Sequence, residues 1–484
     1  MKIILDGKIN RLYVQSLCML FFRGEKFPEN EENPRGILEV KLTENADGVG
    51  AQAHLIYDEN EASEYAYEKF NSKVSFDRTV KTAVGKAVYS VGNKLTGRTV
   101  PWGILTGIRP SKVASELLEY MDEDEAIDTL KEQYLLSYDK AKLCVDVANN
   151  ENSILRRYDD STCSVYISIP FCPTRCSYCS FISYATKKLF DLIPDYVSRL
   201  IEEIDNTFKI IDSLKLKVVS VYIGGGTPTM LSLDYLEKIL SHLSKKLKSR
   251  EIAEFTVEGG RPDTITEEKL SALSKYGVDR ISINPQSLND TVLKSIGRNH
   301  TVKDFYDAYN IAAKSDIKDI NTDLIAGLDG DSFESFKDTV DSIVELSPSN
   351  VTVHSFSVKK SARILTENKD IYNQNEDYAW VSVDYAYKTL TENGYIPYYM
   401  YRQKNTVSDL ENVGYAKAGT FGLYNVLMMG DGHTVFGVGA GATTKLVKRI
   451  NNKTEILRIF YPKYPYEYLQ DNQSKDDEIF NFYK

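Results

Sequence analysis

The chain has 484 residues, of which 42% are hydrophobic and 26% are charged, and its formal net charge is −10. This length predicts about two to four domains, and the composition is that of an ordinary globular protein. The acidic balance argues against a nucleic-acid-binding protein, which needs a basic face, and no stretch approaches the ~20 apolar residues that span a bilayer.

The N-terminal stretch "MKIILDGKINRLYVQSLCMLFFRGEKF" interrupts its apolar residues with charges, so we expect no signal peptide and a cytoplasmic location. Residues 36–57 read as two strands around the turn-like "TENADG", and residues 77–89 and 122–152 read as helices. We therefore expect an α+β N-terminal domain over residues 1–158, without a catalytic constellation. Arg109 follows two glycines and is interpreted as a structural or surface arginine.

From residue 164 onward, short β-branched segments alternate with helix-length amphipathic segments. The segments expected as strands are 165–169, 218–223, 255–257, 280–283, 317–325 and 350–356. Strand, helix, strand, repeated six times, predicts an α/β domain with a parallel sheet and crossover helices, which we place at residues 159–395. A helix is expected over 377–393. Residues 396–484 are rich in tyrosine and glycine and are expected to form a small C-terminal, substrate-covering domain of loops and short strands beside the sheet.

Polar residues follow each of these expected strands, which is where a parallel α/β sheet carries its chemistry. Three cysteines follow the first strand and "GGGTP" follows the second. The later strands are followed by, or carry, Glu258, Asn284 with Gln286, Asp323 and His354. We therefore expect a site at the carboxyl edge of the sheet.

Cys172, Cys176 and Cys179 form the pattern C-x3-C-x2-C in "IPFCPTRCSYCSF". A disulfide framework is not expected, because six cysteines are sparse in a chain of this length. A structural zinc site normally has four protein ligands. The one further candidate, Cys163, precedes the strand that the other three cysteines follow. Three thiolates on one loop favour an iron–sulfur cluster that leaves one iron open to a small molecule.

In this context the cysteine pattern and "YIGGGTP" resemble the radical S-adenosylmethionine (SAM) superfamily. "VEGGRPDT", "ISINPQSL", "IGRNHT" and "NTDLIAGL" are similar to its oxygen-independent coproporphyrinogen III oxidase branch, and "PWGILTGIRP" and "YRQKN" to the HemZ-type coproporphyrinogen dehydrogenase subgroup. The resemblance implies a partial (β/α)6 TIM-like barrel of the radical SAM type, a [4Fe-4S] cluster and SAM as cofactors.

The resemblance also implies roles for individual residues. Cys172, Cys176 and Cys179 would bind the [4Fe-4S] cluster. The residues implied for SAM are Tyr166, Gly225, Gly226, Thr227, Glu258, Gln286, Arg298 and Asp323. Arg402, in the tyrosine-rich "YYMYRQKN", is our candidate anchor for a substrate carboxylate. The glycine-rich residues 437–442 either let a flat substrate approach or form a tightly packed strand end.

The activity that the resemblance implies is oxidative decarboxylation of coproporphyrinogen III propionates to vinyl groups by a 5′-deoxyadenosyl radical, with flavodoxin or ferredoxin as electron donor. Two positions depart from the oxidase pattern. Phe181 stands where those oxidases have a further cysteine, and Ser168 stands where they have histidine. Phe181 is shared with the haem-chaperone branch, but Tyr424 replaces the histidine of that branch's C-terminal motif. The alternatives are therefore a haem-binding chaperone and a radical SAM methyltransferase that acts on haem.

Overall fold

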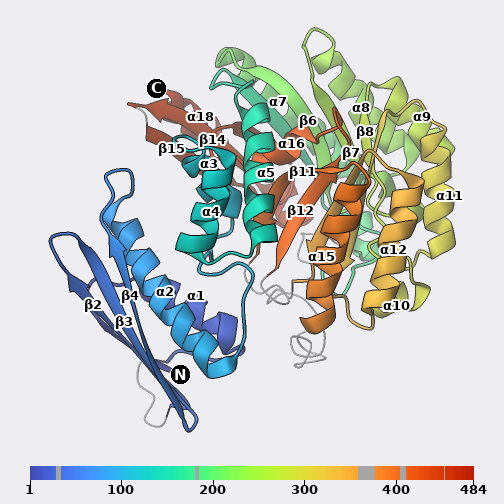
Figure 1. Cartoon of the computed structure of the whole chain (residues 1–484). Coiled ribbons are helices and arrows are strands. Elements are labelled where there is room, and N and C mark those ends of the chain that lie inside the picture. Colours follow the sequence, from blue (N-terminus) through green and yellow to red (C-terminus); the bar gives the residue numbers. More distant parts are fainter. Residues whose placement is uncertain (29–33, 180–184, 358–375, 404–409, 452) are drawn as a thin grey trace. The chain divides into compact units, whose positions relative to one another are not determined.

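Two compact units make up the described chain, Met1–Asn149 and Asn150–Lys484. The computed structural model (Figure 1) describes residues 1–28, 34–179, 185–357, 376–403, 410–451 and 453–484. Phe181 lies outside the described residues. The domain divisions expected at residues 158 and 395 stay predictions.

The first unit is a four-stranded sheet in the order β1-β2-β3-β4, accompanied by helices. Its elements are β1 (Lys2–Asp6), α1 (Arg11–Phe21), β2 (Gly36–Glu44), β3 (Gly48–Tyr57), β4 (Asn60–Lys69), α2 (Phe76–Thr96), α3 (Pro110–Leu117), α4 (Glu123–Tyr134) and α5 (Tyr138–Leu155), the last of which contains the boundary between the units. The two strands expected at 36–57 and the α+β class are confirmed. The helix expected at 77–89 is longer, because Ser75 caps its start and Gly97, in the left-handed conformation, ends it.

The second unit is an eleven-stranded sheet with the order β11-β12-β10-β9-β8-β7-β6-β5-β13-β14-β15. Its strands are β5 (Thr162–Ile169), β6 (Lys217–Gly225), β7 (Glu254–Glu258), β8 (Arg280–Ser282), β9 (Asp319–Ala326), β10 (Asn350–Ser355), β11 (Ile396–Arg402), β12 (Glu411–Ala416), β13 (Thr434–Val438), β14 (Thr443–Ile450) and β15 (Lys453–Phe460). β5 to β10 are parallel and lie side by side in chain order. The six strands expected from the sequence are thus confirmed as a partial (β/α)6 barrel.

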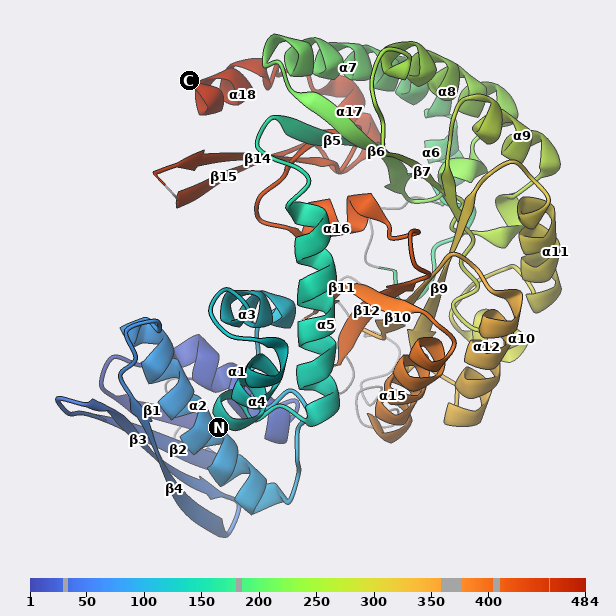
Figure 2. The same ribbon diagram turned by 45° about the horizontal axis from the view of Figure 1, so that its top comes forward.

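Helices cover the outer face of this sheet in an arc from α7 to α15 (Figure 2). The helices of the second unit are α6 (Lys187–Phe190), α7 (Ile193–Ser213), α8 (Leu233–Leu247), α9 (Glu267–Lys275), α10 (Asp290–Ser295), α11 (Val302–Ala313), α12 (Phe333–Leu346), α15 (Glu376–Glu392), α16 (Leu423–Met429), α17 (Pro465–Gln470) and α18 (Asp476–Tyr483), with short 3-10 turns at Pro228–Met230 and Pro262–Thr264. α7 buries one stripe of side chains, including Val197, Leu200 and Ile204, as its apolar spacing predicts. α16 differs from these helices, because it lies on the concave side of the sheet.

The C-terminal segment extends the sheet at both edges. β12 pairs with β10 and β11 pairs with β12, both antiparallel, while β13 pairs parallel with β5 and leads into the antiparallel pair β14 and β15. We expected loops and short strands beside the sheet, whereas the strands belong to the sheet itself. The physical reason is that an open strand edge carries backbone N–H and C=O groups that need partners.

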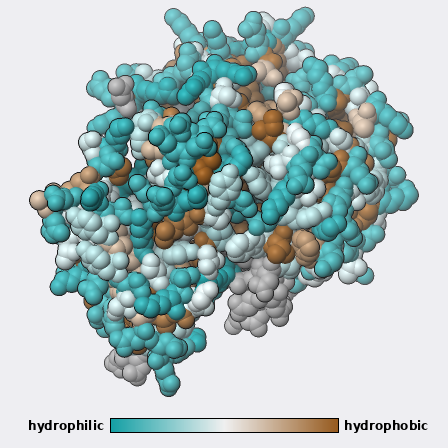
Figure 3. All heavy atoms as spheres, in the orientation of Figure 1, coloured by the Kyte–Doolittle hydropathy of each residue, from teal (hydrophilic) through white to brown (hydrophobic). Residues whose placement is uncertain are grey.

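Hydrophilic side chains predominate on the face of the molecule shown in Figure 3, where apolar residues form small separate groups. Within the described ranges, no helix combines the length and the apolar character that crossing a membrane requires.

Candidate functional site

The candidate site is built on the inner face of the second unit's sheet, where the parallel strands end. The register places Tyr166 of β5 opposite Tyr222 of β6, so both rings lie on one face. β7 continues the row, since Tyr222 pairs with Thr256 and Glu258 follows two residues later on the same face. This part of the barrel interior therefore carries hydroxyl and carboxylate groups, where a purely structural barrel would have branched apolar side chains.

The three predicted cluster ligands lie on the loop that follows β5. Cys172 is 9% exposed, and its Sγ lies 3.3 Å from Oγ1 of Thr227 in the glycine motif. The N–H of Cys179 donates to the carbonyl oxygen of Cys176 at 3.2 Å, which forms a tight turn. The structure thus brings Cys172 to Thr227 and Cys176 to Cys179.

A second loop, which follows α10, holds the cysteine loop. The N–H of Ser177 donates to the carbonyl oxygen of Ile296 at 3.0 Å. Arg298, in the same loop, lies beside the side chain of Cys176, and its Nη1 donates to the carbonyl oxygen of Asn284 at 2.6 Å. Both Nη atoms of Arg298 donate to backbone carbonyl groups. Its expected role as partner of the SAM carboxylate stays a prediction.

The donors on the cysteine loop fit an iron–sulfur cluster better than zinc. The further candidate Cys163 is buried in β5 beside Asp212 and Arg250 of the helix layer, and burial raises the pKa of its thiol. Three sulfurs suit three corners of a [4Fe-4S] cluster, whereas structural zinc is bound by four protein ligands. Among the described residues, no three His, Cys, Asp or Glu side chains lie close enough together to hold a metal ion. The preference for an iron–sulfur cluster over zinc therefore depends on the number of donor atoms and on their being sulfur.

Gly225, Gly226 and Thr227 form a turn that packs on the residues preceding Cys172. Gly225 has a φ of +112°, a conformation that favours glycine. A Cβ on Gly226 would lie 2.5 Å from the carbonyl oxygen of Phe171, which also accepts the N–H of Thr227 at 2.8 Å. The backbones of the glycine turn and the cysteine loop are therefore in direct contact, and a side chain on Gly226 would separate them.

Glu258 joins the glycine motif to the end of β7. Its Oε2 accepts the N–H of Gly225 at 3.2 Å, and its Oε1 accepts the hydroxyl of Tyr222 at 2.5 Å. Burial raises the pKa of Glu258 to about 7; the hydrogen bond from Tyr222 opposes this rise, and the Asp323 carboxylate adds to it. The carboxyl group therefore changes its charge near neutral pH.

Amide side chains beyond β8 present buried oxygens without donors. Asn284 donates Nδ2–H to Oδ2 of Asp323 at 2.8 Å, and Gln286 adopts a φ of +69° and forms a β-bridge with Leu324. Asn284 Oδ1 and Gln286 Oε1 are buried and accept no hydrogen bond within the described part of the chain. Buried acceptors normally have donors, so both oxygens suit a ligand with hydroxyl or amino groups. The backbone N–H of Gln286 donates to the carbonyl oxygen of Asp323 at 3.0 Å, so these two residues are neighbours, and their role toward SAM stays a prediction.

Asp323 also faces the strands beyond it. His354 Nε2 of β10 lies 3.8 Å from Asp323 Oδ2, and the hydroxyl of Tyr401 in β11 lies 3.4 Å from His354 Nδ1. Arg402 follows Tyr401, so its side chain leaves β11 on the opposite face, where it is 7% exposed. Tyr401 rather than Arg402 therefore joins the polar row, and the substrate role of Arg402 stays a prediction.

The glycine-rich segment 437–442 is a tightly packed strand end. Gly437 pairs with Tyr166, and a Cβ on it would lie 2.7 Å from the backbone of Thr443. The carbonyl oxygen of Ala440 accepts the hydroxyl of Ser168 at 2.8 Å. Of the two interpretations of this segment, these contacts support the packed strand end.

The sequence assigns no site role to two aromatic residues of the interior, Tyr222 and Tyr424. Their rings stack with centroids 4.4 Å apart, and the Tyr424 ring lies 6.0 Å from that of Tyr166. Tyr222 could have been predicted from the alternation of side chains along neighbouring strands, which places it on the same face as Tyr166. Tyr424 reaches the site through the packing of α16, and residue spacing does not show that packing.

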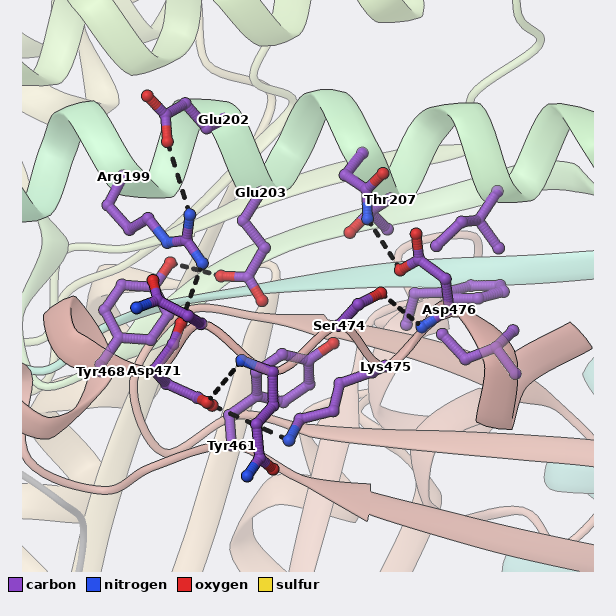
Figure 4. Close-up of a pocket in the computed structure, with 16 residues that line it drawn as sticks. Arg199, Glu202, Glu203, Thr207, Tyr461, Tyr468, Asp471, Ser474, Lys475 and Asp476 are labelled. Atoms are coloured by element: carbon purple, nitrogen blue, oxygen red, sulfur yellow. Dashed lines mark hydrogen bonds and ion pairs between the residues drawn. The ribbon is translucent and has the colours of Figure 1, made fainter.

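A cavity of about 220 Å³ lies between α7 and the C-terminal segment (Figure 4). Within it, Glu203 Oε2 accepts the hydroxyl of Tyr468 and, at 3.0 Å, the N–H of Gly439. Of the described residues that line it, none is a predicted site residue. This cavity is thus separate from the cysteine loop and the glycine turn.

Comparisons with known proteins agree with this geometry. The profile of the Radical SAM superfamily matches residues 166–343. A Bacillus subtilis protein, "Oxygen-independent coproporphyrinogen-III oxidase-like protein HemZ", is 36% identical over 408 residues, which are 83% of this chain and 80% of the relative. A Haemophilus influenzae protein, "Heme chaperone HemW", is 29% identical over 66% of this chain and 81% of its own length.

The fold comparison points the same way. The solved structure of Escherichia coli coproporphyrinogen III oxidase HemN superposes with a TM-score of 0.50 and 22% identity, over 68% of this chain and 72% of that one. The superfamily uses a [4Fe-4S] cluster and SAM, and the thiols of the β5 loop fit that cluster. This chain belongs to the radical SAM superfamily and, within it, to the family of HemZ-like and HemN-like proteins.

Proposed function

We propose that this protein is an oxygen-independent coproporphyrinogen III oxidase, which converts propionate side chains of the tetrapyrrole to vinyl groups in haem biosynthesis. The observation that carries the proposal is the extent of the likeness to the oxidase-like HemZ, which covers 83% of this chain, against 66% for the HemW of Haemophilus influenzae. A cytoplasmic location and an electron donor of the flavodoxin or ferredoxin kind belong to the same proposal.

The reaction removes three components from each propionate. A hydrogen atom leaves the carbon next to the ring, the carboxylate leaves as CO2, and one electron passes to an acceptor, which leaves a vinyl group. When bound, the cluster and SAM would supply the one-electron chemistry that takes a hydrogen atom from an unactivated carbon.

This chain's residues would bind and orient the reactants. Cys172, Cys176 and Cys179 would hold the cluster. Glu258 and Asp323, with the free amide oxygens of Asn284 and Gln286, would accept hydrogen bonds from SAM.

His354 and Tyr401 are the polar groups beyond Asp323, on the side toward β11. They would contact the substrate next to SAM. Exclusion of water by the barrel would protect the reactive species during the transfer.

The test is an anaerobic assay of the full-length protein with reconstituted cluster, SAM, a reductant, an electron acceptor and coproporphyrinogen III. We expect CO2 and vinyl-bearing product by mass spectrometry, and neither with Cys176→Ala. SAM cleavage without CO2 and vinyl product would refute the decarboxylase and leave the radical SAM assignment in place.

A haem chaperone is the second candidate, favoured by the identity with HemW. It predicts stable haem binding by the purified protein without SAM turnover, measured by absorbance titration. Consumption of haem together with a second SAM would instead indicate a methyltransferase that acts on haem.

A further inference from the structure

Both carboxylate oxygens of Glu258 are held by groups of one strand, β6. Oε1 accepts the Tyr222 hydroxyl at 2.5 Å, and Oε2 accepts the Gly225 N–H at 3.2 Å. Gly224, between these two, leaves room for the carboxylate, since a Cβ there would lie 2.8 Å from Oε2. The glycine turn and the orientation of Glu258 are therefore fixed by the same two hydrogen bonds.

The Tyr222 hydroxyl acts as the donor in its bond to Glu258. Burial raises the pKa of Tyr222 well above its ordinary value, and the neighbouring Glu258 raises it further, so the phenol keeps its proton. Its ring packs against two others, with centroids 4.4 Å from Tyr424 and 6.1 Å from Tyr166. The hydroxyl thus sits on a ring that packing fixes in place.

The titratable groups that face Glu258 come from four elements. They are Tyr166 of β5, Tyr222 of β6, Asp323 of β9 and Tyr424 of α16. The tyrosines are neutral because burial raises the pKa of each, and Asp323 adds negative charge. β8 adds Ser282, which pairs with Glu258 and is uncharged. The Tyr222 hydroxyl and the Gly225 N–H are the two groups that favour the ionised carboxylate by hydrogen bonding.

We propose that Tyr222 is a positioning residue, whose hydroxyl holds the Glu258 carboxylate against the Gly225 amide in the orientation that accepts hydrogen bonds from SAM. The inference rests on the proposed placement of SAM beside Glu258 and the glycine turn. Protonation of Glu258 would turn one acceptor oxygen into a donor, which weakens its hold on Gly225 and on SAM.

Tyr222→Phe keeps the ring stack and removes the hydroxyl. In wild type, the hydrogen bond from Tyr222 lowers the pKa of Glu258. Removal of this bond in Tyr222→Phe therefore raises the pKa of Glu258, and SAM binding then requires a higher pH. We expect the midpoint of the pH profile to rise by about one unit, which at pH 7 weakens SAM binding about fivefold and at pH 8.5 restores most of the difference.

The experiment measures SAM affinity of the full-length protein with reconstituted cluster, anaerobically, from pH 6 to pH 8.5. In wild type, the SAM affinity should change with a midpoint near pH 7. The midpoint should be higher in Tyr222→Phe, and Glu258→Gln should show no such change of affinity with pH. Tyr395→Phe is the matched control, since the buried Tyr395 hydroxyl donates to the carbonyl oxygen of Pro348 at 2.7 Å, outside the site. It should leave the midpoint where it is in wild type.

Infrared titration of the carboxyl C=O band, assigned by its loss in Glu258→Gln, follows the same group without SAM. An unchanged band midpoint in Tyr222→Phe, or a loss of SAM affinity that is equal at every pH, overturns the inference. Absence of SAM binding by wild type overturns it together with the SAM site. SAM binding that shifts as expected without CO2 release in the assay above refutes the decarboxylase and supports the role of Tyr222.

Discussion

Glu254 and Arg280 form an ion pair inside the barrel, with Glu254 Oε2 and Arg280 Nε 3.3 Å apart and the two side chains 6% and 4% exposed. The carboxylate also accepts the N–H groups of Leu423 and Tyr424 at 2.8 and 3.0 Å, which are the first two amides of α16. Arg280 in turn donates to Asn321 Oδ1 at 2.8 Å. This pair fastens α16, and with it the Tyr424 ring, to the sheet.

Replacement of Arg280 by methionine should destabilise the second unit by about 3–5 kcal/mol, because it leaves the buried Glu254 carboxylate without its cation. Thermal unfolding measures the loss. The control is Lys303→Ala, which breaks an exposed ion pair with Asp307 and should leave the unfolding midpoint unchanged. Equal effects of the two variants would show that the buried pair does not hold α16.

Alanine at Cys172, Cys176 or Cys179 should each abolish the cluster, since a loop with two thiols cannot fill three corners. Reconstituted wild type should contain about four iron atoms per chain, and each variant close to none, by iron analysis and low-temperature EPR after reduction. Cys163→Ala should keep its iron, because Cys163 faces the helix layer. Loss of iron in that variant would make Cys163 a ligand.

Gly226→Ala should lower the rate of SAM cleavage by about a hundredfold while the protein stays folded, because the added Cβ pushes the glycine turn away from Phe171. Gly107→Ala, where a Cβ meets no atom within 4 Å, is the matched control and should keep the wild-type rate. Normal cleavage by Gly226→Ala would mean that the turn tolerates a side chain and is not a cofactor contact.

Glu203 should make stability depend on pH. Burial raises its pKa to about 6, against hydrogen bonds from Tyr468 and Gly439 that lower it. Between pH 4.5 and pH 6 the unfolded chain ionises before the folded one, so stability falls as pH rises through this window and stays lower above it. Relative to Glu203→Gln, wild type should lose about 2 kcal/mol between pH 4.5 and pH 7.

Thermal unfolding from pH 4 to pH 8 measures this difference. Glu202→Gln changes the neighbouring carboxylate of the same cavity, which is 70% exposed, and should show no such pH dependence. If the stability of wild type and of Glu203→Gln changed with pH in the same way, the raised pKa of Glu203 would be contradicted.

The sequence predicts the parallel part of the barrel well, because each of those strands is a short β-branched run followed by an amphipathic helix. The same pattern places Glu258 at the end of β7, Gln286 beyond β8 and Asp323 within β9. The sequence predicts that the cysteine loop and the glycine turn both follow strands of one parallel sheet, and in the structure Gly226 lies against Phe171.

Residues whose positions depend on distant packing are not predictable in this way. Glu254 and Arg280 read as ordinary charges at strand ends, and only their neighbours in the fold show that they are buried and paired. Tyr424 looks like part of a short apolar run until α16 is placed against β6. Arg402 and its neighbour Tyr401 point to opposite faces of β11. Which of the two faces the site depends on how β11 pairs with β12.

β5, the strand that leads into the cysteine loop, has one neighbour close in sequence and one far away. β6 begins at residue 217, whereas β13 contributes residues 434–438. During synthesis, the second edge of β5 therefore stays open until residues 434–438 have been made. An open strand edge can pair with other chains, so the edge of β5 that leads into the cysteine loop is exposed to such pairing until β13 has been made.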